Sequence, residues 1–184
     1  GVTFTNDRPL INVSQAAPVD PPPEGLRRAM ADVTLNNDEA HLYGPVLGLP
    51  ALRGEVSHQF SLAYGGKIAP ENVAITSGCN QAFCAAIATL ATAGDEVIIP
   101  SPYWVSYPEM VRLAGGKPVI VETKESNGWK MTPEQFEEAM TPATKMVIIN
   151  SPSNPTGAIY SEDELRAIGE VALYEDIMIL SDEI

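Results

Sequence analysis

Asp182 ends an apolar run over residues 176–181 that is typical of a buried β-strand. A carboxylate at the carboxyl end of such a strand is costly unless a cation or a hydrogen-bond donor lies beside it. The sequence therefore predicts a partner of that kind for Asp182. The alternative is that Asp182 caps a turn or a helix that follows the strand.

Asn154 opens the motif Asn-Pro-Thr-Gly, which follows a β-branched run that ends at Asn150. Pro152 and Pro155 restrict the backbone on both sides, so the Asn154 amide is expected to be held rigidly at the edge of a sheet. A rigid amide can donate a hydrogen bond to a phenolate oxygen of a ligand. An Asx-type turn at the end of the strand is the alternative.

Aromatic residues form a third cluster, in which Tyr103, Trp104 and Tyr107 follow two prolines and the run 96–99. A flat aromatic side chain is a good platform for a flat heteroaromatic ring, and offset stacking contributes ~0.5–1.5 kcal/mol beyond burial. Taken alone, the cluster is better explained by aromatic side chains that pack against the sheet.

The fourth cluster holds Ser77, Gly78, Cys79 and Asn80, between an expected strand and an expected helix. A helix N-terminus that follows a hydroxyl and a glycine offers free amides, a positive dipole end and close backbone approach, which suits a phosphate monoester. Taken alone, this motif is better read as an ordinary strand-to-helix turn.

Short β-branched runs alternate with longer helical stretches from residue 72 onward, which predicts an α/β fold with a mostly parallel sheet and crossover helices. The expected strands are 73–76, 96–99, 118–121, 146–149 and 177–180. The expected helices are 24–31, 50–64, 80–91, 106–113, 133–140 and 161–173, the last with a capping box of Ser161 and Glu164. Residues 16–23 are proline-rich and are expected to be extended. Ligands of open α/β sheets bind past the carboxyl ends of the strands, where all four clusters are expected.

Composition restricts the possible functions. A chain of 184 residues with 45% hydrophobic content can form one domain with a real core. The net charge of -13, with only 11 Lys and Arg, argues against nucleic-acid binding. No run approaches the ~18 apolar residues that span a bilayer, and no basic segment precedes an apolar one near residue 1. We expect a cytoplasmic protein without a nucleic-acid or membrane partner.

Cys79 and Cys84 are the only cysteines, and their spacing on a helix points the side chains in different directions. The preferred interpretation is two small, buried apolar side chains in a reducing compartment. His41 and His58 have no second ligand at metal-binding spacing, so we expect no metal site.

In order and approximate spacing, the four clusters resemble the first half of a fold-type I, pyridoxal-phosphate (PLP) dependent aminotransferase of class I/II, aspartate aminotransferase-like. The resemblance implies a three-layer αβα large domain, preceded by an extended N-terminal arm and incomplete at the C-terminus. It implies that residues 1–40 form the arm and part of the small domain, and that residues 41–184 form the first part of the PLP-binding large domain.

The resemblance also implies the cofactor contacts. Residues 77–80 would hold the PLP phosphate, and Trp104 would stack on the pyridine ring. Asn154 would contact the 3-hydroxyl oxygen. Asp182 would pair with the pyridine nitrogen, where its negative charge raises the proton affinity of the ring and makes it an electron sink.

Three further expectations come from the family. Tyr43, in the segment 43–50, would reach the PLP phosphate of a neighbouring subunit in a homodimer, although a structural turn rich in Gly and Pro explains the segment equally well. Ala16, where many relatives have glycine, would bind substrate together with Asn154. None of the lysines matches the Schiff-base lysine, which is expected beyond Ile184, so these residues alone are expected to be catalytically incomplete.

The leading functional interpretation is transfer of an amino group between an amino acid and a 2-oxo acid, most similar to aspartate-type enzymes. A PLP-dependent C–S β-lyase would carry the same cofactor residues. A non-catalytic, effector-binding domain fused behind a DNA-binding module is a third possibility, and we expect it less because the chain begins directly in the proline-rich arm.

Overall fold

The computed structural model describes Ile11 and residues 18–183, and it divides the chain into two compact units, Gly1–Val73 and Ala74–Ile184. Ala16, expected to bind substrate, lies outside the described residues. The boundary expected between residues 40 and 41 stays a prediction. None of the described helices is long and apolar enough to cross a membrane.

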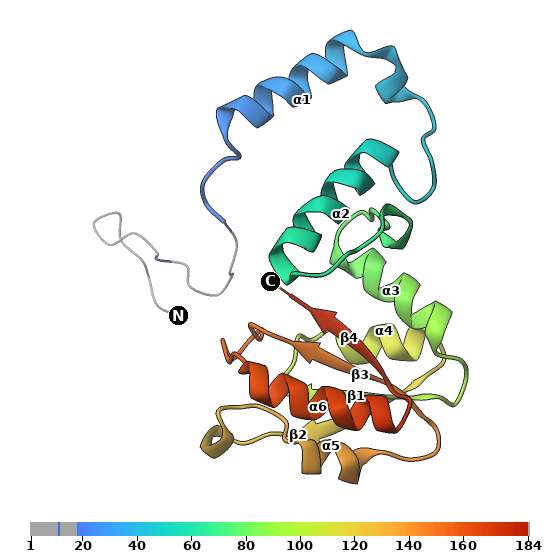
Figure 1. The fold of residues 1–184 in the computed structure, drawn as a ribbon, viewed down its shortest axis with the longest axis vertical. Coiled ribbons are helices and arrows are strands. Elements are labelled where there is room, and N and C mark those ends of the chain that lie inside the picture. Colours follow the sequence, from blue (N-terminus) through green and yellow to red (C-terminus); the bar gives the residue numbers. More distant parts are fainter. Residues whose placement is uncertain (1–10, 12–17, 184) are drawn as a thin grey trace, which may run out of the picture. The chain divides into compact units, whose positions relative to one another are not determined.

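The first unit contains α1 (Glu24–Asn36), η1 (Asp38–His41), α2 (Pro50–Tyr64) and η2 (Pro70–Asn72) (Figure 1). The bounds of α2 are confirmed: Pro50 occupies the first turn and Gly65, with a φ of 67°, ends the helix. The predicted end of α1 at residue 31 is wrong. The Thr34 hydroxyl donates to the Met30 carbonyl, and the helix continues until Asn37, which caps η1.

Arg53 and Ser57 tie α2 to the segment that follows it. The Arg53 guanidinium donates to the carbonyls of Val73 at 2.7 Å and Pro70 at 2.8 Å. The buried Ser57 hydroxyl donates to the Ile68 carbonyl at 2.6 Å. These bonds satisfy backbone groups that no strand pairs, and they hold residues 68–73 against the helix.

The second unit is built on a parallel sheet of four strands in the order β2-β1-β3-β4. Its strands are β1 (Glu96–Ser101), β2 (Lys117–Glu122), β3 (Thr144–Asn150) and β4 (Met178–Asp182). The predicted strand 73–76 is wrong. Val73 has extended dihedral angles, but the segment pairs with no strand of the described residues, and extended, β-branched residues form a strand only with a hydrogen-bonded partner.

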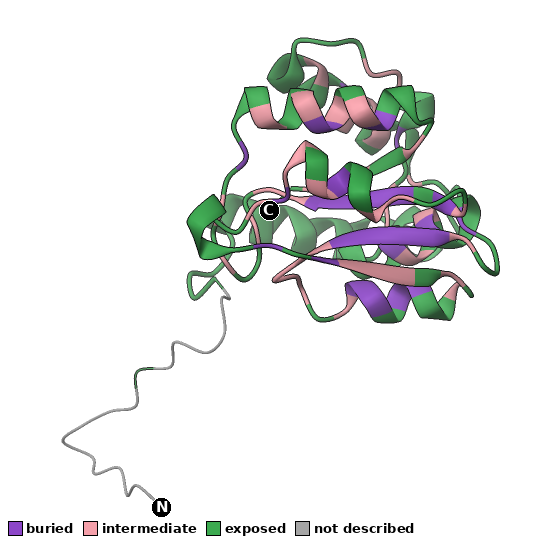
Figure 2. Ribbon diagram, turned by 90° about the horizontal axis from the view of Figure 1, so that it is seen from below, coloured by how far each residue is buried: buried purple, intermediate pink, exposed green. Residues whose placement is uncertain are grey.

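Helices cover both faces of this sheet. Alternate side chains of β1 and β3 pack on one face against α3 (Cys79–Leu90) and α4 (Tyr107–Leu113). Side chains of opposite direction pack against α5 (Pro133–Ala139) and α6 (Glu162–Tyr174). The short η3 (Glu125–Asn127) follows β2. Figure 2 shows the central strands buried between these helices. The α/β class with a parallel sheet is confirmed.

Two capping boxes fix the starts of the helices on the second face. The predicted box of Ser161 and Glu164 is confirmed, and an unpredicted one joins Thr132 and Gln135 at α5. Glu164 also pairs with Lys130, at 2.5 Å. The Lys130 hydrogen bond and the Ser161 amide lower the pKa of Glu164.

Candidate functional site

The strand order creates one point at which the chain leaves the sheet in opposite directions. From β1 the chain crosses to β2 on one side, and later returns to β3 on the other side of β1. Loops that follow neighbouring strands diverge at such a point and leave a crevice at the carboxyl ends, which is where open α/β sheets bind ligands. Trp104 follows β1 and Asn154 follows β3, so both lie on the loops that border this crevice.

Asp182 is positioned beside Asn150, its register partner in the ladder of β3 and β4. The Asn150 amide and the Ser151 backbone N–H each donate to the Asp182 backbone carbonyl at 3.1 Å. The half-buried carboxylate accepts a hydrogen bond at Oδ2 from the Tyr107 hydroxyl. No group of the described residues donates to Oδ1.

Tyr107 is a site residue whose role the sequence did not reveal. Its ring is 2% exposed and lies between Phe83, at a centroid distance of 5.2 Å, and Trp104, at 5.5 Å. Burial raises the pKa of Tyr107 far above its ordinary value, and the hydrogen bond to the Asp182 carboxylate raises it further. The hydroxyl therefore stays protonated and acts as the donor. The pair is 75 residues apart, and no local pattern points to it.

Trp104 is half-buried and packs against the hydrophobic cluster that α3 and α4 form on the sheet. Its ring meets that of Tyr107 edge-on, at an interplanar angle of 80°. The contacts with the core support the packing interpretation of Trp104, and stacking on a ligand stays a prediction.

The N-terminus of α3 remains open. Gly78 precedes the helix with a φ of 83°, and no side chain caps the first turn. Amides of a first turn have no acceptor within the helix, so they are free to bind an anion. The Ser77 amide is an exception, since it donates to the Gln81 side chain at 2.6 Å. Residues 77–80 are all exposed.

The expectation that both cysteines are buried is wrong for Cys79. The sequence predicted two buried cysteines, but Cys79 is exposed at the first position of α3, and only Cys84 is partly buried. Neither cysteine is in a disulfide.

Asn154 lies in a closed turn. Its backbone amide donates to the Asn150 side chain at 2.6 Å, and the Ser153 amide donates to the Ala158 carbonyl at 2.9 Å. The turn interpretation and the ligand interpretation are therefore compatible: Asn150 supplies the side-chain acceptor of the turn, and the Asn154 side chain is exposed.

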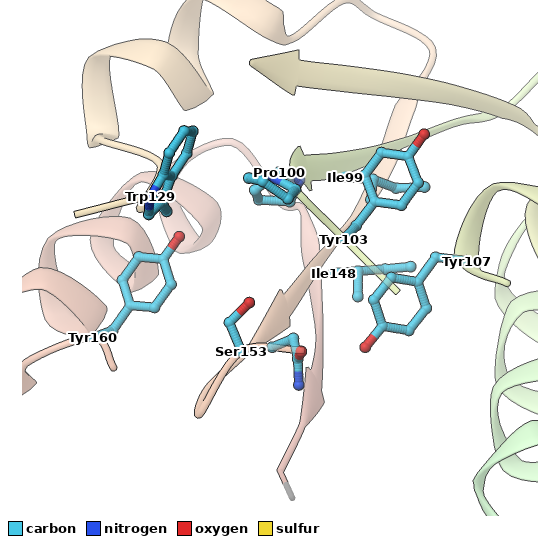
Figure 3. Close-up of a pocket in the computed structure, with 10 residues that line it drawn as sticks. Ile99, Pro100, Tyr103, Tyr107, Trp129, Ile148, Ser153 and Tyr160 are labelled. Atoms are coloured by element: carbon cyan, nitrogen blue, oxygen red, sulfur yellow. The ribbon is translucent and has the colours of Figure 1, made fainter. Parts of the chain in front are cut away.

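A small cleft lies between the carboxyl ends of β1 and β3 (Figure 3). Its lining includes Tyr107 and Asn150 and, across the cleft from Tyr107 in Figure 3, Trp129 and Tyr160, which the sequence did not single out. The volume of the cleft is about 20 Å³, which is enough for about one water molecule. It adjoins the predicted site and is too small to be that site.

Two expectations concern other parts of the chain. Tyr43 is fully exposed in the first unit, and its role stays a prediction. Within the described part of the chain, no three His, Cys, Asp or Glu side chains are placed to hold a metal ion.

Comparison with known proteins gives a consistent result. The sequence model of the family described as aminotransferase class I and II matches residues 8–184. An aspartate aminotransferase of Geobacillus stearothermophilus is 53% identical over 148 residues, which cover 80% of this chain and 38% of that protein. An asparagine–oxo-acid transaminase of Streptococcus mutans is 40% identical and is matched over 96% of this chain and 45% of its own length.

Solved structures agree with the sequence matches. A tetra mutant of the Thermus thermophilus aspartate aminotransferase superposes with a TM-score of 0.89 at 39% identity, over 96% of this chain and 48% of that one. The chain thus spans less than half the length of these three proteins.

Proposed function

The chain belongs to the aminotransferase class I and II family, and from this premise we propose that it carries most of the PLP site of an aspartate-type aminotransferase. The whole enzyme would transfer an amino group between an amino acid and a 2-oxo acid. The names of its relatives favour aspartate as the donor. The Schiff-base lysine is expected outside these residues.

The observation that carries the proposal is the half-satisfied carboxylate of Asp182 at the crevice. One oxygen accepts from Tyr107, and the other has no donor among the described residues. A half-buried carboxylate in this state is suited to a cationic ring N–H. When bound, PLP would supply an electron-withdrawing ring next to the substrate Cα, and the charge of Asp182 would keep the ring nitrogen protonated.

The other predicted residues fit the remaining parts of the cofactor. The uncapped first turn of α3 offers amides and a positive dipole end to the phosphate dianion, and Gly78 has no atom within 4 Å of the place a Cβ would take. Trp104 offers part of an indole ring. Asn154, on its closed turn, offers an exposed amide to the 3-hydroxyl oxygen.

Three of the four lysines of the second unit lie at the amino end of the sheet or are paired with a carboxylate, and the fourth, Lys124, lies between β2 and η3. Lys117 begins β2 and pairs with Glu96 at 2.7 Å, at the amino end of the sheet. Lys145 lies near the amino end of β3, and Lys130 is bound by Glu164. These placements support a catalytic lysine supplied by the rest of the protein.

We also propose a cytoplasmic homodimer in which Tyr43 binds the phosphate of the partner. The exposed apolar residues around Tyr43 support a contact there: Leu42, Val46, Leu47 and Leu49. The free cysteines fit a reducing compartment. Light scattering of the full-length protein should give the mass of a dimer, and Tyr43→Phe should weaken PLP binding.

An amino-acid panel tests the central activity. The full-length protein, loaded with PLP, should convert aspartate and a 2-oxo acid acceptor into the exchanged pair of acids. Release of ammonia and pyruvate from a cysteine-type substrate without exchange would instead identify a β-lyase. Failure to bind PLP would reject both reactions and leave an effector-binding domain of another kind.

A further inference from the structure

Tyr107 contacts two of the residues that are expected to bind the cofactor. Its hydroxyl donates to Oδ2 of Asp182, and its ring meets Trp104 edge-on. Its ring also packs against Phe83 of α3. These three residues come from β4, from the loop after β1 and from α3, so one side chain connects the elements that border the crevice.

The position of Tyr107 is fixed by the core and does not depend on a ligand. The residue begins α4, and its backbone amide donates to the Trp104 carbonyl at 3.1 Å. The ring is 2% exposed and rests on Phe83 of α3. A side chain with this packing keeps one rotamer, and its hydroxyl is therefore a preorganised donor.

The protonation state makes the direction of this hydrogen bond unambiguous. Burial and the neighbouring Asp182 charge both raise the pKa of Tyr107, so the hydroxyl keeps its proton through the neutral range. Tyr107 donates, the carboxylate accepts at Oδ2, and Oδ1 has no donor among the described residues.

We propose that Tyr107 is a positioning residue, whose hydroxyl holds Oδ2 of Asp182 so that Oδ1 is presented to the protonated ring nitrogen of PLP. This inference rests on the proposed PLP site and adds a residue that acts through Asp182. Without the hydroxyl, the carboxylate can rotate about its last side-chain bond, and it must be ordered again each time the cofactor binds.

A tyrosine that only fills the core would behave differently. Phenylalanine keeps the ring and its contacts with Phe83 and Trp104, so Tyr107→Phe isolates the hydroxyl. If the hydroxyl acts through Asp182, its removal matters only while that carboxylate is present. A packing effect would be the same with or without the carboxylate.

The test is a double-mutant cycle for PLP affinity in the full-length protein, with Tyr107→Phe, Asp182→Ala and the double variant. Tyr107→Phe is expected to raise the dissociation constant for PLP about 10-fold, the usual effect of losing a hydrogen bond to a charged group. In the Asp182→Ala background, the same change should have almost no effect. Phe136→Leu serves as the control, since Phe136 is a fully buried ring in the cluster on the opposite face of the sheet, and this change should cost the same factor in both backgrounds.

A second cycle measures the unfolding of the apoprotein in urea with the same variants. It should show a coupling between Tyr107 and Asp182 without cofactor, because the hydrogen bond is present in the ligand-free fold. Equal losses of PLP affinity in both backgrounds, no loss in either, or no coupling in the apoprotein would each overturn the inference. A wild-type protein that binds no PLP would reject the proposed function itself, and this result is visible without any variant.

Discussion

The two ends of the same sheet satisfy a carboxylate in opposite ways. At the amino end, Glu96 begins β1, is 6% exposed and has both oxygens bound, by the Lys117 ammonium at 2.7 Å and by the Thr141 hydroxyl at 2.6 Å. At the carboxyl end, Asp182 ends β4 and accepts only from Tyr107 among the described residues.

This difference separates a structural acid from an acid kept available for a ligand. Both carboxylate oxygens of Glu96 accept hydrogen bonds from the protein itself, so Glu96 is not available to a ligand and contributes to stability. Asp182 is oriented by one neutral donor and retains accepting capacity, which is the state expected of a group that binds a cation. The comparison predicts that changes at the two ends affect different observables.

The largest effect is expected at the carboxyl end. Asp182→Asn keeps the shape of the side chain and removes the charge that would hold the ring nitrogen protonated. Amino transfer by the PLP-loaded, full-length protein should fall by about 10²–10³-fold, the usual loss when one preorganised electrostatic group is removed. Single-turnover kinetics with aspartate measures this. A rate within about tenfold of wild type would place Asp182 outside the chemistry.

Glu96→Gln should show the reverse pattern. The substitution replaces one acceptor oxygen by an amide facing Lys117 or Thr141, and should lower the free energy of unfolding by about 1–2 kcal/mol with little change in amino transfer. Glu109→Gln is the matched control, since Glu109 pairs with Arg112 on an exposed helix surface. It should change stability little. If the folded Glu96→Gln variant lost its amino-transfer activity, the carboxylate at the amino end could not be assigned a purely structural role.

The stability that Glu96 contributes is expected to depend on pH. The Lys117 and Thr141 hydrogen bonds lower the pKa of Glu96 below its ordinary value of 4.5. A lowered folded-state pKa gives stability that is present above about 4.5 and is lost as the pH falls through the folded-state value. Urea unfolding between pH 6 and pH 3 should therefore show a shallower acid loss in Glu96→Gln than in wild type. Parallel curves would show that Glu96 contributes no pH-dependent stability.

A smaller effect is expected at Cys79, which is exposed at the first turn of α3. If the PLP phosphate binds this turn, PLP should slow the alkylation of Cys79 by iodoacetamide. Mass spectrometry can follow Cys79 and the half-buried Cys84 in the same sample, and Cys84 should change less. Equal rates with and without PLP at Cys79 would argue against a phosphate at this helix.

Local patterns predicted most of the second unit correctly. The four strands of the sheet and the capping box of Ser161 and Glu164, like the bounds of α2 in the first unit, follow from apolar periodicity, caps and proline, all of which act over a few residues. Residues 73–76 have the same local signals as a strand, and the prediction failed because strand formation depends on a partner.

Some residues of the site could also be predicted from local patterns, and others depend on tertiary packing. Trp104, Asn154 and Asp182 could be selected because each lies at or after the carboxyl end of a strand, and these ends meet at one edge of a parallel sheet. The role of Tyr107 could not be predicted, since its hydrogen bond to Asp182 joins residues that are 75 positions apart in the sequence. The exposure of Cys79 was missed for a related reason: composition favours burial, but its position in the first turn leaves it uncovered.

The most direct test of the account is the state of the ring nitrogen in bound PLP. In the full-length protein, loaded with PLP labelled with ¹⁵N at that atom, the chemical shift should be that of a protonated ring at neutral pH. It should move to the neutral value in Asp182→Asn. A neutral nitrogen in the wild type, or a shift that the substitution leaves unchanged, would contradict the pairing of Asp182 with the cofactor.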